Sequence, residues 1–218
     1  MSPPPGLLLR PPDAFALLVL AHGAGAGMRH PFMEGVARAL GREGVATLRY
    51  EFPYMAEGRK RPDRPSVLVP AVRAAVEEGR RRVPDLPLFA GGKSMGGRMT
   101  STAAAEGLGH ESSEGRPVRG LVFLGFPLHP AGKPGTGRAD HLSMVPLPML
   151  FLQGDRDKLA ELPLLAPVVE ALGPRAGLHV VQGADHGFHV LKRSGRTDAE
   201  VLEELSRVAA AWMGERVR

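Results

Sequence analysis

One stretch of the chain, residues 88–105, limits the possible folds more than any other. It reads LFAGGKSMGGR at positions 88–98 and continues into small residues that favour a helix up to position 105. An apolar run that passes through glycines into a helical segment is typical of a strand that turns sharply into a helix. Within it, GKSMG at positions 92–96 matches the pattern G-x-S-x-G. In that pattern glycines leave room for a tight turn, and the serine is exposed at the end of the strand.

Two other interpretations of this stretch compete with a reactive serine. The first is a glycine-rich turn without chemistry, because three fixed letters in five positions recur by chance. The second is a phosphate-binding loop, G-x-x-x-x-G-K-S, which requires glycine at a position where this chain has Pro87. The proline makes nucleotide binding the weakest of the three interpretations.

Short apolar segments alternate with helical patterns along the whole chain. Strands are expected at residues 14–21, 44–50, 86–90, 118–124, 147–152 and 178–181. Helices are expected at residues 32–41, 67–82, 159–172 and 197–213, and from the serine turn to about residue 105. The stretches 53–65, 107–117 and 126–144 are expected to be connections, and residues 1–12 a loose arm or an edge strand. This alternation predicts an α/β fold with a doubly wound, mostly parallel sheet of six or seven strands, in a single domain over residues 1–218.

Composition narrows the classes of function. The chain has no cysteine, which excludes disulfides, thiolate metal sites and a cysteine nucleophile. The net charge of +5 would suit nucleic acid, but the basic residues are dispersed without interleaved aromatic residues, so no nucleic-acid partner is expected. The apolar run at 14–21 is too short to span a membrane, and the first residues lack the basic region of a signal peptide, which favours the cytoplasm. The absence of asparagine suits a thermostable protein.

Small residues follow the first buried strand, at the edge of the sheet where ligands bind in such folds. The sequence there is HGAGAG at positions 22–27. Side chains this small let a backbone N–H approach a ligand oxygen. Together with the N–H of Met95, that group would bind a developing oxyanion. The alternative is a plain turn, because a dinucleotide-binding loop requires glycine where this chain has Met28.

An acidic and a histidine-containing motif follow two later strands. GDRD at positions 154–157 offers Asp155 and Asp157, either of which would orient an imidazole, cap a helix or form a surface ion pair. GADHGFH at positions 183–189 places His186 between the last strand and the last helix, within reach of Ser94. The order serine, aspartate, histidine, each after its own strand, is the order of a hydrolase triad. The other candidates among the histidines are expected to be structural or exposed: His22, His110, His129, His141 and His179.

These motifs together resemble the α/β-hydrolase superfamily over essentially the full length of the chain. More narrowly, they are similar to its dienelactone-hydrolase-like branch and, within that, to the KANL3/Tex30-related group. The segments that carry the resemblance are AHGAGAGM at 21–28, HPFM at 30–33, GGKSMGGR at 91–98, FPLHP at 126–130, QGDRD at 153–157 and GADH at 183–186.

The resemblance implies a serine hydrolase of small esters or thioesters that forms an acyl-enzyme and needs no metal or organic cofactor. It assigns Ser94 as nucleophile, His186 as base and Asp157, rather than Asp155, as the acid of the triad. The N–H groups of Ala24 and Met95 would form the oxyanion hole. Dienelactone hydrolases use cysteine as nucleophile, so their substrate is not carried over. Some relatives serve in multiprotein assemblies, so an interaction module with little or no activity is the alternative.

The chain departs from the usual family pattern in two ways. Only a short arm precedes the first buried strand, and only residues 125–146 separate the fourth and fifth predicted strands, where lids are commonly inserted. No separate lid domain is therefore expected, and the site should be small and open. Met28, Met33, Met55 and Phe126 are candidates for an adaptable apolar wall of the substrate pocket. The alternative is that most of these side chains fill the core.

Overall fold

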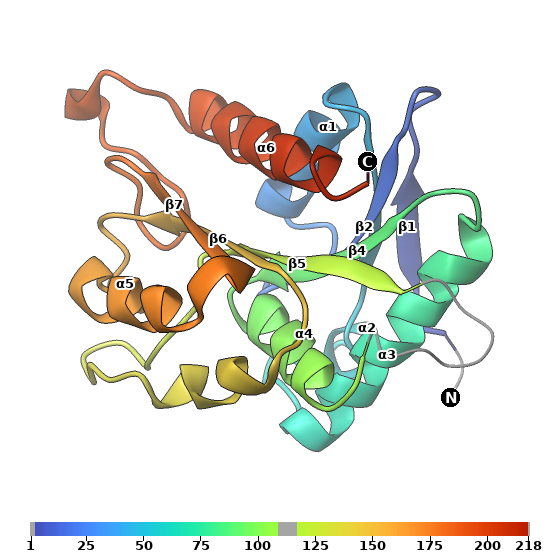
Figure 1. Ribbon diagram of the computed structural model, residues 1–218, viewed down its shortest axis with the longest axis horizontal. Coiled ribbons are helices and arrows are strands. Elements are labelled where there is room, and N and C mark those ends of the chain that lie inside the picture. Colours follow the sequence, from blue (N-terminus) through green and yellow to red (C-terminus); the bar gives the residue numbers. More distant parts are fainter. Residues whose placement is uncertain (1–2, 109–116, 218) are drawn as a thin grey trace.

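A seven-stranded sheet forms the centre of the computed structural model, which describes residues 3–108 and 117–217 (Figure 1). The strands lie in the order β1-β3-β2-β4-β5-β6-β7, and β1 alone runs antiparallel to its neighbour. This confirms the prediction of a doubly wound, mostly parallel sheet. Residues 1–12 were expected to form a loose arm or an edge strand, and β1 is an edge strand. The strands are β1 (Gly6–Leu9), β2 (Ala16–Ala21), β3 (Val45–Tyr50), β4 (Leu88–Lys93), β5 (Val118–Leu124), β6 (Met149–Gly154) and β7 (Ala176–Val181).

Helices cover both faces of the sheet (Figure 1). Helices α1 (Pro31–Arg42) and α6 (Asp198–Gly214) lie together on one face. The other face carries α3 (Pro65–Arg82), α4 (Met95–Ala105) and α5 (Leu162–Ala171). Shorter elements are the helix α2 (Pro53–Ala56) and the 3-10 helices η1 (Gly137–Met144), η2 (Gly173–Arg175) and η3 (Lys192–Ser194). No helix in the described part of the chain is both long enough and apolar enough to cross a membrane.

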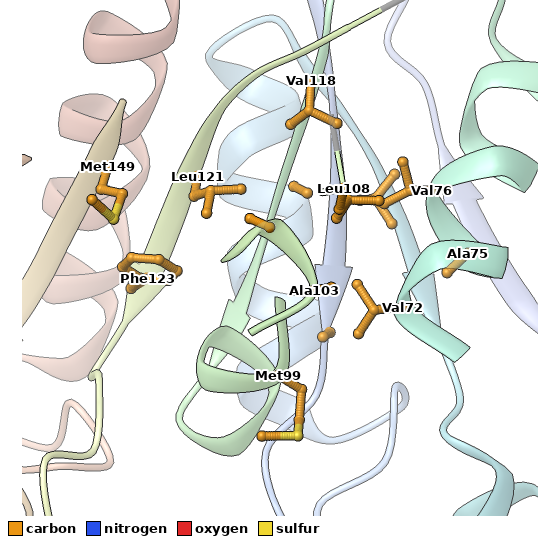
Figure 2. Packing of buried hydrophobic residues seen from close by; sticks show 14 of the residues in the cluster. Val72, Ala75, Val76, Met99, Ala103, Leu108, Val118, Leu121, Phe123 and Met149 are labelled. Atoms are coloured by element: carbon orange, nitrogen blue, oxygen red, sulfur yellow. The ribbon is translucent and has the colours of Figure 1, made fainter. Parts of the chain in front are cut away.

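The two helical layers explain the continuous apolar runs of the central strands. Every residue of β2 is buried, and its side chains alternate between a core under α1 and α6 and a core under α3, α4 and α5. Figure 2 shows the second core, where Val72 of α3, Met99 of α4 and Phe123 of β5 lie in one cluster. A strand that packs against helices on both faces has no polar side, so its sequence shows no alternation.

Strand β4 extends further than the sequence predicted. The prediction ended this strand at residue 90 and treated the following glycines as a turn, whereas pairing with β5 continues to Lys93. A Cβ on Gly91 would lie 2.0 Å from the carbonyl oxygen of Val122, so only glycine lets the two strands approach here. The strand therefore stays extended through its glycines, and the reversal into α4 falls on Ser94.

Other segments also differ from the prediction. The connection predicted at 53–65 begins with α2, whose Tyr54 is fully buried, and the one at 126–144 contains η1. The helix predicted from residue 159 begins at Leu162, because Pro163 occupies one of its first positions, where a missing N–H costs nothing. The connection predicted at 107–117 lies largely outside the described residues. Between β5 and β6, where every residue is described, the chain forms η1 and loops and no separate lid.

Candidate active site

Ser94 is the single residue between the end of β4 and the start of α4. Its backbone has φ 50° and ψ −116°, a conformation that residues with side chains rarely adopt. Flanking glycines permit the turn, since a Cβ on Gly92 or Gly96 would lie 2.7 or 2.6 Å from the carbonyl oxygen of Ala21. Helix α4 begins at the next residue, Met95, so N–H groups without helical partners face the serine end. The helix end favours negative charge beside the Ser94 hydroxyl.

His186 contacts both Ser94 and Asp157. Its Nε2 lies 2.8 Å from Ser94 Oγ, and its Nδ1 lies 2.6 Å from Asp157 Oδ2. Asp157 is only 2% exposed, and its carboxylate also accepts the N–H of Leu159 at 2.7 Å. An ionised carboxylate only accepts hydrogen bonds, so Nδ1 carries the proton and Nε2 of the neutral ring can accept one from the serine hydroxyl. Side chains that follow three different strands thus meet in the arrangement needed to deprotonate a hydroxyl.

The first aspartate of the GDRD motif, Asp155, binds a backbone group away from the imidazole. Asp155 Oδ1 accepts the N–H of Gly183 at 2.8 Å and so holds the start of the loop that carries His186. The structure therefore brings Asp157, and not Asp155, to the imidazole.

Gln153, which the sequence analysis did not single out, holds the Asp157 carboxylate. Its Nε2 donates to Asp157 Oδ2 at 2.5 Å, and its Oε1 accepts the N–H of Phe126 at 2.9 Å. The side chain is fully buried at the end of β6. A glutamine that ends an otherwise apolar strand was the signal available, because a buried amide needs polar partners.

The glycine-rich loop after β2 lies against the serine. A Cβ on Gly23 would be 3.7 Å from Ser94 Cβ, and Ala24 follows in the exposed part of the loop. The N–H of Gly25 donates to the hydroxyl of Tyr54 at 3.1 Å. Burial raises the pKa of Tyr54, which keeps that hydroxyl neutral. The sequence analysis missed Tyr54 because it lies within a polar stretch that was interpreted as a surface connection.

Comparison with known proteins identifies the family. The chain matches the family described as an alpha/beta hydrolase domain over residues 14–214. The protein is an α/β-hydrolase. That range contains every residue of the cluster around Ser94, and it spans all the strands except β1. The narrower resemblance to the KANL3/Tex30-related group stays a prediction.

Solved structures of three bacterial proteins resemble this α/β-hydrolase. An alpha-beta serine hydrolase homologue from Coxiella burnetii is 21% identical, with a TM-score of 0.72 over 93% of this chain and 90% of that chain. A dienelactone hydrolase from Anabaena variabilis is 24% identical, with a TM-score of 0.72 over 98% and 92%. A serine hydrolase without a lid from Xanthomonas campestris is 22% identical, with a TM-score of 0.71 over 95% and 88%. At these identities the likeness concerns the fold alone.

The apolar residues proposed for the substrate pocket of this α/β-hydrolase fall into two groups. Met33 and Phe126 are 1% and 0% exposed; the first belongs to the core under α1 and α6, and the second packs edge-on against other phenylalanines. Their packing suits the alternative that they fill the core. Met28 is 7% exposed, and Met55 is half-buried, with its methyl group 3.2 Å from the position of a Cβ on Gly27. These two side chains lie at the loop after β2.

Other histidines of the α/β-hydrolase contact groups outside the Ser94 cluster. His22 is fully buried between the carbonyl of Gly23 and the N–H of Phe52, and burial lowers its pKa. His110 lies outside the described residues. No group of three or more histidines and carboxylates that would suit a metal ion occurs within residues 3–108 and 117–217. Three more of the histidines expected to be structural or exposed pair as His129 with Glu161, His141 with Ser101 and His179 with Glu204, at 2.7, 2.8 and 2.7 Å.

Proposed function

We propose that this α/β-hydrolase is a serine hydrolase of small ester or thioester substrates. The observation that carries the proposal is the contact of His186 with Ser94 Oγ at 2.8 Å and with Asp157 Oδ2 at 2.6 Å. In this mechanism Nε2 of His186 takes the hydroxyl proton while Ser94 Oγ attacks the carbonyl carbon. The N–H groups of Ala24 and Met95 stabilise the negative charge on the carbonyl oxygen.

The second half of the reaction uses the same residues. The His186 imidazolium, stabilised by Asp157, gives its proton to the leaving alcohol or thiol, which leaves an acyl group on Ser94. A water molecule then loses a proton to His186 and attacks the acyl carbonyl, so that the acid is released and the Ser94 hydroxyl is restored. No step needs a metal or an organic cofactor.

The connection between β5 and β6 forms no lid, and we expect the open site to take small substrates. Of the four residues proposed for the apolar wall, Met28 and Met55 lie at the loop after β2, which contains the proposed oxyanion donor Ala24, whereas Met33 and Phe126 are packed in the core. A location in the cytoplasm, stability at high temperature and the lack of a nucleic-acid partner stay predictions from composition.

A fluorophosphonate probe is expected to label the wild-type protein and to leave Ser94→Ala unlabelled. Such probes react with a serine only when a base activates its hydroxyl. Ser101→Ala is the matched control, because Ser101 also lies 2.8 Å from a histidine nitrogen but is fully buried and donates to the carbonyl of Arg98. Labelling should survive in this control. Labelling of Ser94→Ala at the wild-type level would refute the proposed nucleophile.

An interaction module with little activity finds no support in the exposed surface. Among the described residues, the large hydrophobic side chains that are exposed are Val67 at 41% and Met144 at 64%. A docking face for another protein would require a contiguous apolar patch. A folded wild-type protein that turns over no short p-nitrophenyl ester would favour this second function.

A further inference from the structure

The lysine that precedes Ser94 reaches across the site to the loop that carries His186, residues 182–191, here called the histidine loop. Lys93 is the last residue of β4, and its Nζ donates to the carbonyl oxygen of His186 at 2.5 Å, although the two residues are 93 positions apart. Its aliphatic stem passes the loop after β2, where a Cβ on Gly23 would be 3.5 Å from Lys93 Cγ. One side chain thus joins the backbone beside Ser94 to the backbone of the proposed base.

Two aromatic rings and a glycine enclose the ammonium group. Nζ lies 5.8 Å from the ring centre of Phe32 and 5.2 Å from that of Phe188, and these rings stack on each other at 5.6 Å. On another side is Gly125, with φ +70°, where a Cβ would lie 2.9 Å from Nζ and 3.5 Å from His186 Nδ1. Because Gly125 has no Cβ, it leaves room for both the ammonium of Lys93 and the imidazole of His186.

The histidine loop is tightly bent, so its position depends on a few contacts. Phe188 has φ +63°, which is strained for a residue with a ring side chain. Asp185 Oδ1 accepts the N–H groups of Gly187 and His189 at 2.8 and 3.0 Å. These bonds shape the loop internally but do not tie it to the serine strand. The hydrogen bond from Lys93 makes that connection.

The ammonium costs the fold free energy. Burial lowers the pKa of Lys93 to about 8, although the carboxylates of Asp157 and Asp185 favour the charged form. A methionine of similar length would avoid the loss of hydration. Lys93 therefore acts through its contact with His186 and does not add to the net stability of the fold.

We propose that Lys93 is a positioning residue, which holds the imidazole of His186 against Ser94 Oγ through its hydrogen bond to the His186 carbonyl. The inference rests on the proposed function, since Lys93 acts only through His186. Without this bond the loop can drift away from β4. A misplacement on the order of 1 Å in a catalytic group lowers the rate by about 10²-fold.

Three variants test the inference with p-nitrophenyl acetate turnover and the rate of fluorophosphonate labelling. Lys93→Met keeps an unbranched side chain, shorter by its terminal atom, but removes the donor, and kcat is expected to fall by about 10- to 100-fold with KM unchanged. Lys93→Arg restores a cationic donor and is expected to recover most of the lost kcat. Lys60→Met changes an exposed lysine and should leave both constants at the wild-type level. The urea midpoint of Lys93→Met should equal or exceed that of the wild type at neutral pH.

Two results would overturn the inference while leaving the proposed function intact. The first is wild-type kcat and labelling rate in Lys93→Met. The second is a fall in kcat that is matched by a fall in the urea midpoint and is not recovered in Lys93→Arg, because this would make Lys93 a structural residue. An unlabelled wild type would overturn the proposed function, and the inference with it, before any Lys93 variant is measured.

The pH dependence of stability offers a separate test of the partly buried ammonium of Lys93. The titratable groups around this ammonium are the carboxylates of Asp157 and Asp185 and, beside the same Gly125, the imidazole of His186. At a pH between the pKa of about 8 in the folded chain and the ordinary lysine pKa of 10.5, the unfolded chain holds a proton on Lys93 that the folded chain has released. Raising the pH through this range therefore stabilises the fold. The urea midpoint of the wild type, relative to Lys93→Met, is expected to rise from neutral pH to pH 10.5. Parallel curves for the two proteins would contradict a desolvated lysine.

Discussion

Asp157→Asn is expected to lower kcat by about 10⁴-fold without unfolding the protein. The Asp157 carboxylate accepts a hydrogen bond from the protonated Nδ1 of His186 at 2.6 Å. This leaves Nε2 free to take the proton of Ser94. An asparagine amide can donate to Nδ1 instead, which favours the ring tautomer with its proton on Nε2. That tautomer cannot accept the serine proton. Turnover of p-nitrophenyl acetate by the purified variant measures the loss.

Asp155→Asn is the matched control for this prediction, two residues away in the same motif. Asp155 Oδ1 accepts the N–H of Gly183 at 2.8 Å, and an asparagine side chain retains that acceptor. The kcat of this variant should therefore stay close to the wild-type value. Equal losses in the two variants, or a loss confined to Asp155→Asn, would show that Asp157 is not the residue that orients His186.

Gly96→Ala is expected to lower the free energy of unfolding by about 3 kcal/mol or more. A Cβ at this position would lie 2.6 Å from the carbonyl oxygens of both Ala21 and His22, and these are backbone atoms that cannot rotate away. Helix α4 would have to move away from β2, and the turn at Ser94 would move with it. Urea unfolding followed by circular dichroism measures the change, and the labelling of Ser94 should fall as well.

Gly177→Ala serves as the control for an added methyl group. Its nearest contact would be the Leu150 side chain at 3.8 Å, an ordinary van der Waals distance, so stability should change little. A Gly96→Ala protein as stable as this control would mean that α4 and β2 can separate without cost. The tight turn at Ser94 would then not depend on the close approach of the two elements.

The proposed chemistry depends on side chains outside the Ser94–His186–Asp157 cluster that hold its loops in place. Gln153 fixes the carboxylate, and Tyr54 holds the loop that contains Ala24. Lys93 ties the histidine loop to the serine strand. Each of these residues joins segments at the ends of two different strands, so the cluster is held from several sides of the sheet edge. Catalytic groups need such support, because small shifts in their geometry cost large factors in rate.

The order of the main strands and helices could be predicted from the sequence alone, and so could the edge of the sheet that carries the candidate site. Continuous apolar runs revealed strands buried on both faces, and glycines around Ser94 revealed a sharp turn into a helix. These features are local, because burial and backbone conformation restrict which residue types a position accepts. The sequence also placed Ser94, Asp157 and His186 after separate strands of a parallel sheet, whose carboxyl ends share one edge.

Which side chains touch one another depends on the packing of the whole chain. Asp155 and Asp157 are equivalent in local pattern, and it is the path of the chain after β6 that turns one to His186 and the other to Gly183. The contact between Lys93 and His186 could not be derived from spacing, because it joins residues 93 positions apart. Local pattern sets the kind of element, whereas distances between atoms on different elements follow from how the whole sheet and its loops pack.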